Sequence, residues 1–150
     1  MHINLKNQRI LVTGASRGIG RAIARQLSES GAEVIIHYNS NKEEAETLLN
    51  QLKNPANIEA CDLSQSAEVV GFIPRLVEKY GPLTALVNNA GISPMAPDTL
   101  PTGEWLQIWE KVMAVNATAV GILSKEFIDQ AKAQENGRIV MISSRAAFRG

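Results

Sequence analysis

The chain has 150 residues, and its 15 lysines and arginines balance 15 aspartates and glutamates, so its formal net charge is zero. This balance excludes the broad positive surface that non-specific binding to nucleic acid or to an anionic membrane requires. The 45% hydrophobic content is that of a globular protein, and the single cysteine, Cys61, excludes an intrachain disulfide or a multi-thiolate metal site. Neither a run of ~18 apolar residues nor a secretory signal is present. We therefore expect one domain of a cytoplasmic protein with no membrane partner and no metal.

Short apolar runs alternate with amphipathic stretches along the chain. Strands are predicted at 9–13, 34–38, 57–60, 83–87 and 138–142, and helices at 19–30, 42–52, 66–80 and 102–135. Gly71 and Pro74 weaken the third helix, and the fourth is interrupted near Asn116. This alternation predicts an α/β fold of Rossmann type, a doubly wound parallel sheet with right-handed crossovers.

A glycine-rich turn separates the first strand from the first helix. It reads Thr13-Gly14-Ala15-Ser16-Arg17-Gly18-Ile19-Gly20. At such a junction glycines permit a tight turn and close approach to a pyrophosphate, while the helix dipole and free N–H groups attract an anion. The sequence disfavours a P-loop because no Gly-Lys-Ser/Thr follows. The turn predicts dinucleotide binding, and the alternative is an ordinary loop.

The segment after the second strand bears on the choice of coenzyme. Residues 37–41 contain neither aspartate nor glutamate, whereas NAD-binding folds usually place an acid there to bond the ribose 2′-hydroxyl. Arg17 of the glycine turn would instead bond a 2′-phosphate. The sequence therefore favours NADP over NAD, with a merely solvated Arg17 as the alternative.

Four segments in this order resemble the short-chain dehydrogenase/reductase family, especially its 3-oxoacyl-acyl-carrier-protein reductase-like members. They are the glycine turn, Asp62-Leu63 after the third strand, Asn88-Asn89-Ala90-Gly91 after the fourth, and 109–116 followed by 139–144. The resemblance covers essentially the whole chain. It implies an oxidoreductase that interconverts the carbonyl and alcohol forms of a small-molecule substrate by hydride transfer. It also implies that the protein assembles as a homotetramer or homodimer.

The resemblance also implies a role for each matching residue. Gly14, Gly18, Ile19 and Gly20 would line the pyrophosphate, Ser16 and Arg17 would bind the 2′-phosphate, Asp62 and Leu63 would hold the adenine, and Asn88, Ala90 and Gly91 would border the adenosine. Asn116 would hold a water of the proton relay, and Ser144 would bond the substrate carbonyl, with Ser143 as its alternative.

Each of these positions also has a purely structural interpretation. Asp62 could cap a helix near Ser64, and the asparagines could satisfy turns. We expect Cys61, His2 and His37 to be structural residues, and Trp105 and Trp109 to pack on one helical face.

The family's catalytic Tyr-x-x-x-Lys pair is expected to be absent. Tyr38 lies at the adenosine end and Tyr80 ends an earlier helix, so neither is placed as the catalytic tyrosine. The family builds seven strands, of which this chain would supply five and leave a bare apolar edge at 139–142. We expect residues 1–150 to be the N-terminal, dinucleotide-binding part of a longer enzyme, inactive alone. A catalytically silent nucleotide-binding protein is the alternative; a methyltransferase would leave 88–91 and Ser144 unexplained.

Overall fold

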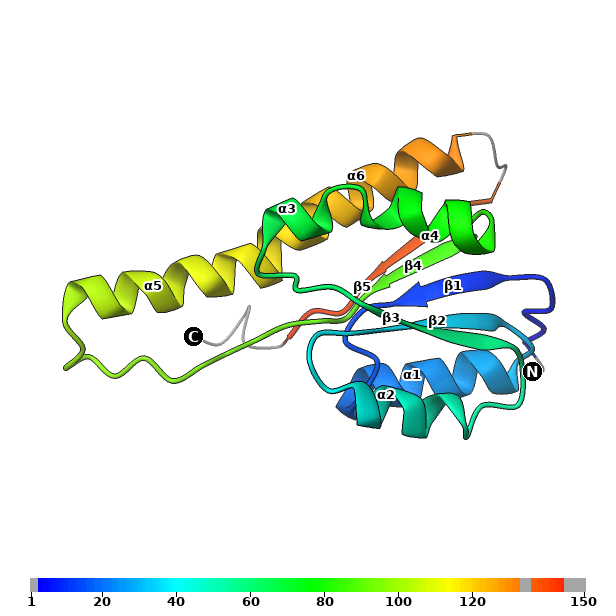
Figure 1. Cartoon of the computed structure of the whole chain (residues 1–150), viewed down its shortest axis with the longest axis horizontal. Helices are drawn as coiled ribbons and strands as arrows, with labels where there is room; N and C mark the ends of the chain where they lie inside the picture. Colours follow the sequence, from blue (N-terminus) through cyan, green and yellow to red (C-terminus); the bar gives the residue numbers. More distant parts are fainter. Residues whose placement is uncertain (1–2, 133–135, 145–150) are drawn as a thin grey trace.

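The computed structural model describes residues 3–132 and 136–144, which form one parallel five-stranded sheet (Figure 1). The strand order is β3-β2-β1-β4-β5. The strands are β1 (Arg9–Val12), β2 (Glu33–Tyr38), β3 (Ala56–Ala60), β4 (Ala85–Asn88) and β5 (Arg138–Met141). The chain moves outward from β1 to β3 and then returns to the other side of β1. This reversal between β1 and β4 is the switch point where doubly wound folds bind their ligands, and it confirms the predicted fold class.

Helices cover both faces of the sheet (Figure 1). On one face lie α1 (Gly18–Glu29) and α2 (Lys42–Leu49), and on the other α3 (Ser66–Val69), α4 (Phe72–Tyr80) and α6 (Ala119–Ala131). A further helix, α5 (Thr102–Met113), extends beyond the sheet and continues through a π-helical turn, η1 (Ala114–Thr118), into α6.

Two apolar cores lie on opposite faces of the sheet because successive side chains of a strand point to opposite sides. The core against α4 and α6 contains Leu11, Ile35, Leu86, Leu123 and Phe127, among others. The core against α1 and α2 contains Ile10, Val12, Val34, Ile36 and Leu48, among others. Burial on both faces explains why the central strands read as continuous apolar runs in the sequence.

The predicted helix at 66–80 is two helices, because Gly71 adopts a left-handed conformation with φ of +80°. The carboxylate of Glu126 on α6 accepts hydrogen bonds from the N–H groups of Gly71 and Ile73 and so fixes the start of α4. The predicted interruption near Asn116 is confirmed as the π-helical turn η1. Of the predicted helix at 102–135, residues 133–135 lie outside the described part of the chain.

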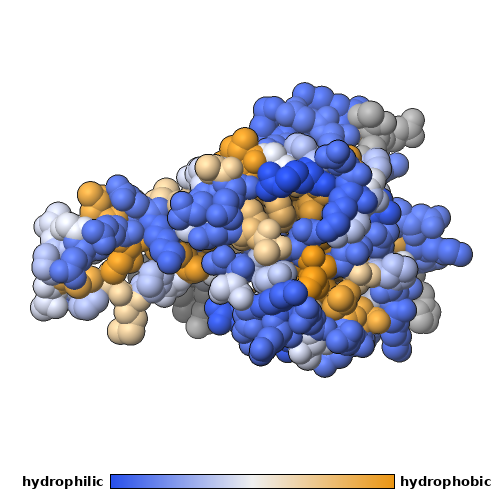
Figure 2. Space-filling view, viewed as in Figure 1, coloured by the Kyte–Doolittle hydropathy of each residue, from blue (hydrophilic) through white to orange (hydrophobic). Residues whose placement is uncertain are grey.

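The α5 arm carries apolar side chains that the described residues do not cover. Trp105 and Trp109 stack with ring centroids 5.4 Å apart, yet they remain 41% and 50% exposed. Figure 2 shows apolar surface on this arm among polar side chains. The tryptophans therefore pack on each other rather than in a core. Among the described residues, no helix combines the length and the hydropathy that crossing a membrane requires.

Candidate functional site

A cleft of about 550 Å³ lies at the carboxyl edge of the sheet, at the switch point between β1 and β4. The loops that follow β1, β2, β3 and β4 form most of its wall. Its lining includes Gly14, Ser16, Arg17, Gly18, Ile19 and Gly20 of the glycine turn, Tyr38, Asn39, Ser40 and Asn41 after β2, Asp62, Leu63 and Ser64 after β3, and Asn89, Ala90, Gly91 and Ile92 after β4. The structure thus brings most of the predicted coenzyme-binding residues to one cleft.

The glycine turn has the geometry that its sequence predicts. Gly14 and Gly18 have φ of +62° and +55°, which side chains rarely tolerate. A Cβ on Gly20 would lie 2.4 Å from the carbonyl oxygen of Gly14, so the helix packs directly on the strand end. No side chain of the described residues caps α1, whose first N–H groups therefore open toward the cleft. Free amides at a helix N-terminus attract an anionic ligand.

The loop after β4 is fastened to the glycine turn by two polar side chains. The buried hydroxyl of Thr13 accepts hydrogen bonds from the N–H groups of Asn89 and Ala90, at 2.9 and 3.0 Å. The Asn89 side chain donates to the carbonyl oxygens of Thr13 and Gly14, at 2.8 and 3.2 Å. The structural interpretation, in which the asparagines satisfy a turn, therefore holds for Asn89, which also lines the cleft although it is not among the predicted coenzyme-binding residues.

His37 fastens the same turn from the other side. The N–H of Gly14 donates to Nδ1 of His37 at 3.0 Å, and Nε2 lies 2.9 Å from the carbonyl oxygen of Cys61. Burial lowers the pKa of His37 to about 4, and the bond to Cys61 opposes that shift only in part. His37 is structural as expected, but the prediction does not include its contact with the glycine turn. A polar residue inside the apolar run 34–38 was the available signal.

Asp62 combines a turn-forming role with a place in the cleft wall. Its Oδ1 accepts bonds from the hydroxyl and the N–H of Ser64, at 2.7 and 2.9 Å. These two bonds lower the pKa of Asp62, so the group is a carboxylate at neutral pH. Because both bonds use Oδ1, Oδ2 can accept a bond from a ligand. The neighbouring Leu63 is buried and offers an apolar wall.

Beside the loop after β2, the cleft wall is polar and contains Arg17, Ser40 and Asn41. Arg17 is exposed at the cap of α1, so its guanidinium is free to reach a ligand phosphate. Glu44 on the first turn of α2 also lines this region, and its Oε2 is buried. The side chain of Arg21 holds the main chain there, because it donates to the carbonyl oxygen of Glu44 at 3.0 Å.

Asn116 lies in η1 and binds the main chain of Ile92 on both sides. Its Oδ1 accepts from the N–H of Ile92 at 2.9 Å, and its Nδ2 donates to the Ile92 carbonyl at 2.8 Å. A Cβ on Gly91 would lie 3.6 Å from Asn116 Oδ1. The helix interruption therefore holds the loop that leaves β4 beside the cleft.

Three predicted site residues lie outside the cleft lining: Asn88, Asn116 and Ser144. Asn88 is buried behind the wall, where its Nδ2 donates to the hydroxyl of Ser124 at 3.1 Å. Ser144 is exposed after β5, as is Ser143. The cleft residues come from the ends of β1, β2, β3 and β4, whereas these serines follow the outermost strand.

Although the catalytic Tyr-x-x-x-Lys pair is expected to be absent, the sequence does contain one match to this spacing, because Lys42 lies four residues after Tyr38. The structure separates the two residues. Tyr38 ends β2 with its side chain 9% exposed, whereas Lys42 begins α2. A pair spaced by one helical turn must share a helix, so this match does not supply the family's catalytic pair.

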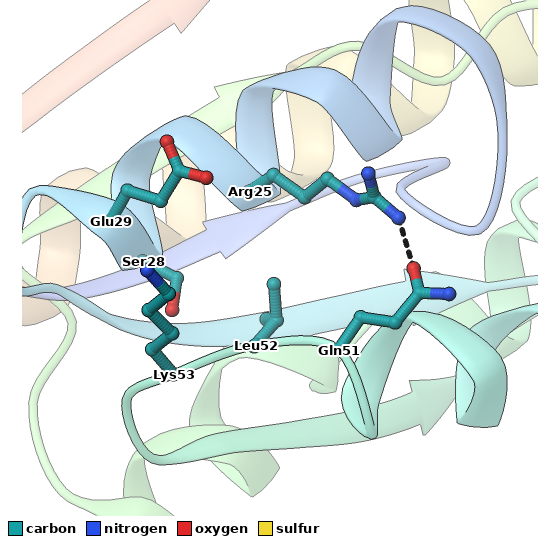
Figure 3. Close-up of a pocket in the computed structure, with 6 residues that line it drawn as sticks. All are labelled: Arg25, Ser28, Glu29, Gln51, Leu52 and Lys53. Atoms are coloured by element: carbon teal, nitrogen blue, oxygen red, sulfur yellow. Dashed lines mark hydrogen bonds between the residues drawn. The ribbon is translucent and has the colours of Figure 1, made fainter.

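A second hollow, of about 150 Å³, lies between the end of α1 and the segment after α2 (Figure 3). Its charged lining residues are Arg25, Glu29 and Lys53, and Arg25 donates a hydrogen bond to Gln51. The end of α1 leads into β2, so this hollow sits at the opposite edge of the sheet from the glycine turn. Within the described part of the chain, no three His, Cys, Asp or Glu side chains gather as metal ligands.

The family model described as short chain dehydrogenase matches residues 8–150. The chain belongs to this family. It is 40% identical over 148 residues to the 3-oxoacyl-acyl-carrier-protein reductase FabG of Rickettsia prowazekii, covering 99% of this chain and 58% of that protein. It is 34% identical over 144 residues to a short-chain type dehydrogenase/reductase of Picea abies, covering 89% of this chain and 52% of that protein. This short-chain dehydrogenase chain thus spans about half the length of the curated relatives it matches.

Solved structures agree with this assignment. A short-chain dehydrogenase from Burkholderia cenocepacia in complex with NADP is 35% identical, with a TM-score of 0.87 over 97% of this chain and 59% of that one. A metagenomic short-chain oxidoreductase in complex with NADP is 34% identical, with a TM-score of 0.84 over 93% of this chain and 63% of that one. The Rossmann-type fold of this short-chain dehydrogenase is therefore shared with structures determined in complex with NADP.

Proposed function

We propose that the whole protein is an NADP-dependent oxidoreductase that interconverts a carbonyl and an alcohol by hydride transfer. The observation that carries this proposal is the cleft at the switch point, in which the uncapped start of α1 faces a polar corner with Arg17. Similarity to the FabG reductases and to NADP-bound short-chain dehydrogenases supports it. The residue set fits a dinucleotide because amides, an arginine and a carboxylate line one cleft in the order that such a ligand needs.

The pyrophosphate would bind the N-terminal amides of Gly18, Ile19 and Gly20. The N–H of Gly14 is already bonded to His37, so it would not bind the pyrophosphate. Gly14 would instead let the ligand lie close to the main chain, because it has no side chain. A Cβ on Gly14 would lie 2.9 Å from Cα of Ala90, so any side chain would push the two loops apart. Gly14 therefore keeps the floor of the cleft narrow.

The 2′-phosphate and the adenine of the coenzyme would be bound by different kinds of side chain. Ser16 and Arg17 would hold a 2′-phosphate through charge-assisted bonds, whereas Asp62 would accept from the adenine amino group and Leu63 would pack against the ring. Ala90 and Gly91 would border the ribose, with Asn88 supporting their loop from behind. Asp62 fits this role because it is ionised and has one carboxylate oxygen left.

The nicotinamide, when bound, supplies or accepts the hydride. The chain's own residues would orient the substrate and move a proton. Ser144 would donate a hydrogen bond to the carbonyl oxygen and stabilise the charge that develops there, and Ser143 is its alternative. Asn116, fixed by its two bonds to Ile92, would position a water of the proton relay.

Location and assembly belong to the same proposal. A cytoplasmic protein is consistent with the single cysteine, Cys61, which is a buried thiol. Assembly as a tetramer or dimer would cover the exposed Trp105 and Trp109 of α5. The small-molecule substrate would be a carbonyl compound or its alcohol.

Calorimetric titration of the whole protein with NADP⁺ and NAD⁺ tests the coenzyme assignment. We expect tighter binding of NADP⁺, and we expect Arg17→Ala to weaken NADP⁺ by roughly 10- to 100-fold while leaving NAD⁺ nearly unchanged, because one charge-assisted bond contributes about 1.5–3 kcal/mol. Arg25→Ala, on α1 near the hollow at the opposite edge of the sheet, is the matched control. Equal affinity for both coenzymes in the parent would contradict the NADP assignment.

Turnover separates the enzyme from its alternative, a silent nucleotide-binding protein. The whole protein is assayed with NADPH and an acetoacetyl thioester, and then with simple ketones. NADPH oxidation that depends on the carbonyl compound is expected. Tight coenzyme binding without turnover on any of these substrates would favour the silent protein.

A further inference from the structure

The ring of His37 has a defined protonation state because both nitrogens are hydrogen-bonded. Nδ1 accepts from the N–H of Gly14 at 3.0 Å, so it carries a lone pair. The carbonyl oxygen of Cys61, 2.9 Å from Nε2, can only accept, so Nε2 carries the hydrogen. The ring is therefore a neutral imidazole that joins the first glycine of the turn to the end of β3.

The surroundings of His37 favour this neutral form. The side chain is 2% exposed, its burial lowers its pKa to about 4, and the edge-to-face ring of Phe72 on α4 lies 5.8 Å away. Burial also raises the pKa of the Cys61 thiol to about 11, so that group stays neutral. The charged side chains on the elements around the ring are hydrogen-bonded to groups other than the ring. Asp62 accepts from Ser64, and Glu68 accepts from the N–H of Asp62. Arg75 donates to the carbonyl oxygens of Val70 and Glu68, and Glu126 accepts from the N–H groups of Gly71 and Ile73.

The main chain of His37 holds the turn as well. Its carbonyl oxygen accepts from the N–H of Ala15 at 2.9 Å. Two successive amides of the turn, Gly14 and Ala15, are thus committed to one residue and point away from a ligand. The anion-binding amides are consequently those of the α1 N-terminus, and their position depends on where His37 holds the preceding residues.

We infer that His37 is a positioning residue for coenzyme binding: its neutral ring fixes the glycine turn relative to the loop that begins at Asp62, and so sets the spacing between the pyrophosphate and adenine ends of the cleft. This inference rests on the proposed function, since it concerns how the same cleft recognises a dinucleotide. A ligand that spans both ends should depend on His37 more than a ligand confined to the adenosine end.

Two variants of the whole protein separate the hydrogen bond from the volume of the ring. His37→Asn places an amide oxygen near the position of Nδ1, so Gly14 keeps an acceptor although the reach to Cys61 is lost. His37→Phe keeps a buried ring but removes both bonds. Val34→Ala, in the same strand and buried on the opposite face of the sheet, is the control for general loss of core packing.

The ligands are NADP⁺ and adenosine 2′,5′-bisphosphate, which lacks the pyrophosphate bridge. By calorimetry at neutral pH we expect His37→Phe to weaken NADP⁺ about tenfold, equivalent to about 1.4 kcal/mol, and the bisphosphate less than about threefold. Val34→Ala should stay within about threefold of the parent for both ligands. His37→Asn keeps the bond to Gly14 but loses the bond to Cys61, so it should weaken NADP⁺ more than Val34→Ala does and less than His37→Phe does. Urea unfolding of each variant verifies that the folded state is the one titrated.

Three results would overturn the inference while leaving the proposed function intact. They are unchanged NADP⁺ binding in His37→Phe, NADP⁺ binding in His37→Asn that is as tight as in the parent, and a loss in Val34→Ala that equals the loss in His37→Phe. A parent protein that binds neither ligand would instead overturn the proposed function and this inference with it. Nitrogen-15 NMR gives a reading independent of ligand: Nδ1 should have the shift of an unprotonated nitrogen, and a protonated Nδ1 at neutral pH would refute the assigned tautomer.

Discussion

Replacing Thr13 by valine tests how strongly the loop after β4 is tied to the glycine turn. The Thr13 hydroxyl accepts two amide bonds, from Asn89 and Ala90, and its residue is only 1% exposed. Valine has nearly the same shape, so the core stays filled while both N–H groups lose their acceptor. Each unsatisfied donor costs about 1–3 kcal/mol. Because Asn89 and Ala90 are only partly buried, we expect a total loss of about 2–4 kcal/mol in the free energy of unfolding.

Urea denaturation of the whole protein measures this loss. Thr13→Ser is the matched control, because it keeps the hydroxyl and removes only a methyl group, at a cost of about 1 kcal/mol. The carbonyl oxygen of Val87, to which the Thr13 hydroxyl donates at 3.3 Å, still accepts the main-chain N–H of residue 13 in both variants. A valine variant within about 0.5 kcal/mol of the parent, or a serine variant as unstable as valine, would refute the reasoning.

Two further predictions concern the same corner of the molecule. Gly20→Ala would place a Cβ 2.4 Å from the Gly14 carbonyl oxygen and 2.5 Å from Asn89 Nδ2. We therefore expect NADP⁺ binding to weaken at least about tenfold and the free energy of unfolding to fall by about 1–3 kcal/mol. Gly121→Ala on α6 is the control, because its Cβ would meet nothing within 4 Å and should change neither quantity. The pKa of His37 is about 4 in the folded chain against 6.5 for the free side chain, so the unfolded state binds more protons between these values and stability falls as pH drops through that window. The loss from pH 8 to pH 5 is about 2 kcal/mol and should vanish in His37→Asn; an equally steep profile in that variant would contradict a buried neutral ring.

The sheet and most of the cleft could be predicted from local sequence pattern. The strands are apolar runs that end in glycine or polar residues, and a parallel sheet buried on both faces produces that pattern directly. The glycine turn could be placed because its residues are adjacent in the chain and their conformations are local. The same holds for Asp62 and Leu63, which lie directly after β3 and reach the cleft as expected.

The parts that sequence reasoning missed depend on contacts between distant segments. The sequence indicates Gly71 as a weak point of the helix at 66–80, but it does not show that Glu126, 55 residues away, accepts the amide bonds that fix the start of the second helix. His37 looked like one polar residue in a strand, since its partners Gly14 and Cys61 are 23 and 24 residues away. The spacing of Tyr38 and Lys42 can be read in the sequence, but only the structure shows that the two residues lie on different elements and do not form a catalytic pair.

The order of the strands explains why the glycine turn follows β1 and no other strand. β1 pairs with β2 on one side and β4 on the other, so the loop that leaves it can be held from both neighbours. His37 from β2 holds Gly14 through its N–H, and Asn89 after β4 holds Gly14 through its carbonyl oxygen. An edge strand such as β3 has a neighbour on one side only, and its loop could not be fixed in this way. A turn that must present amides to a ligand at a constant spacing therefore gains most from the central position, which is also where the order of the sheet reverses.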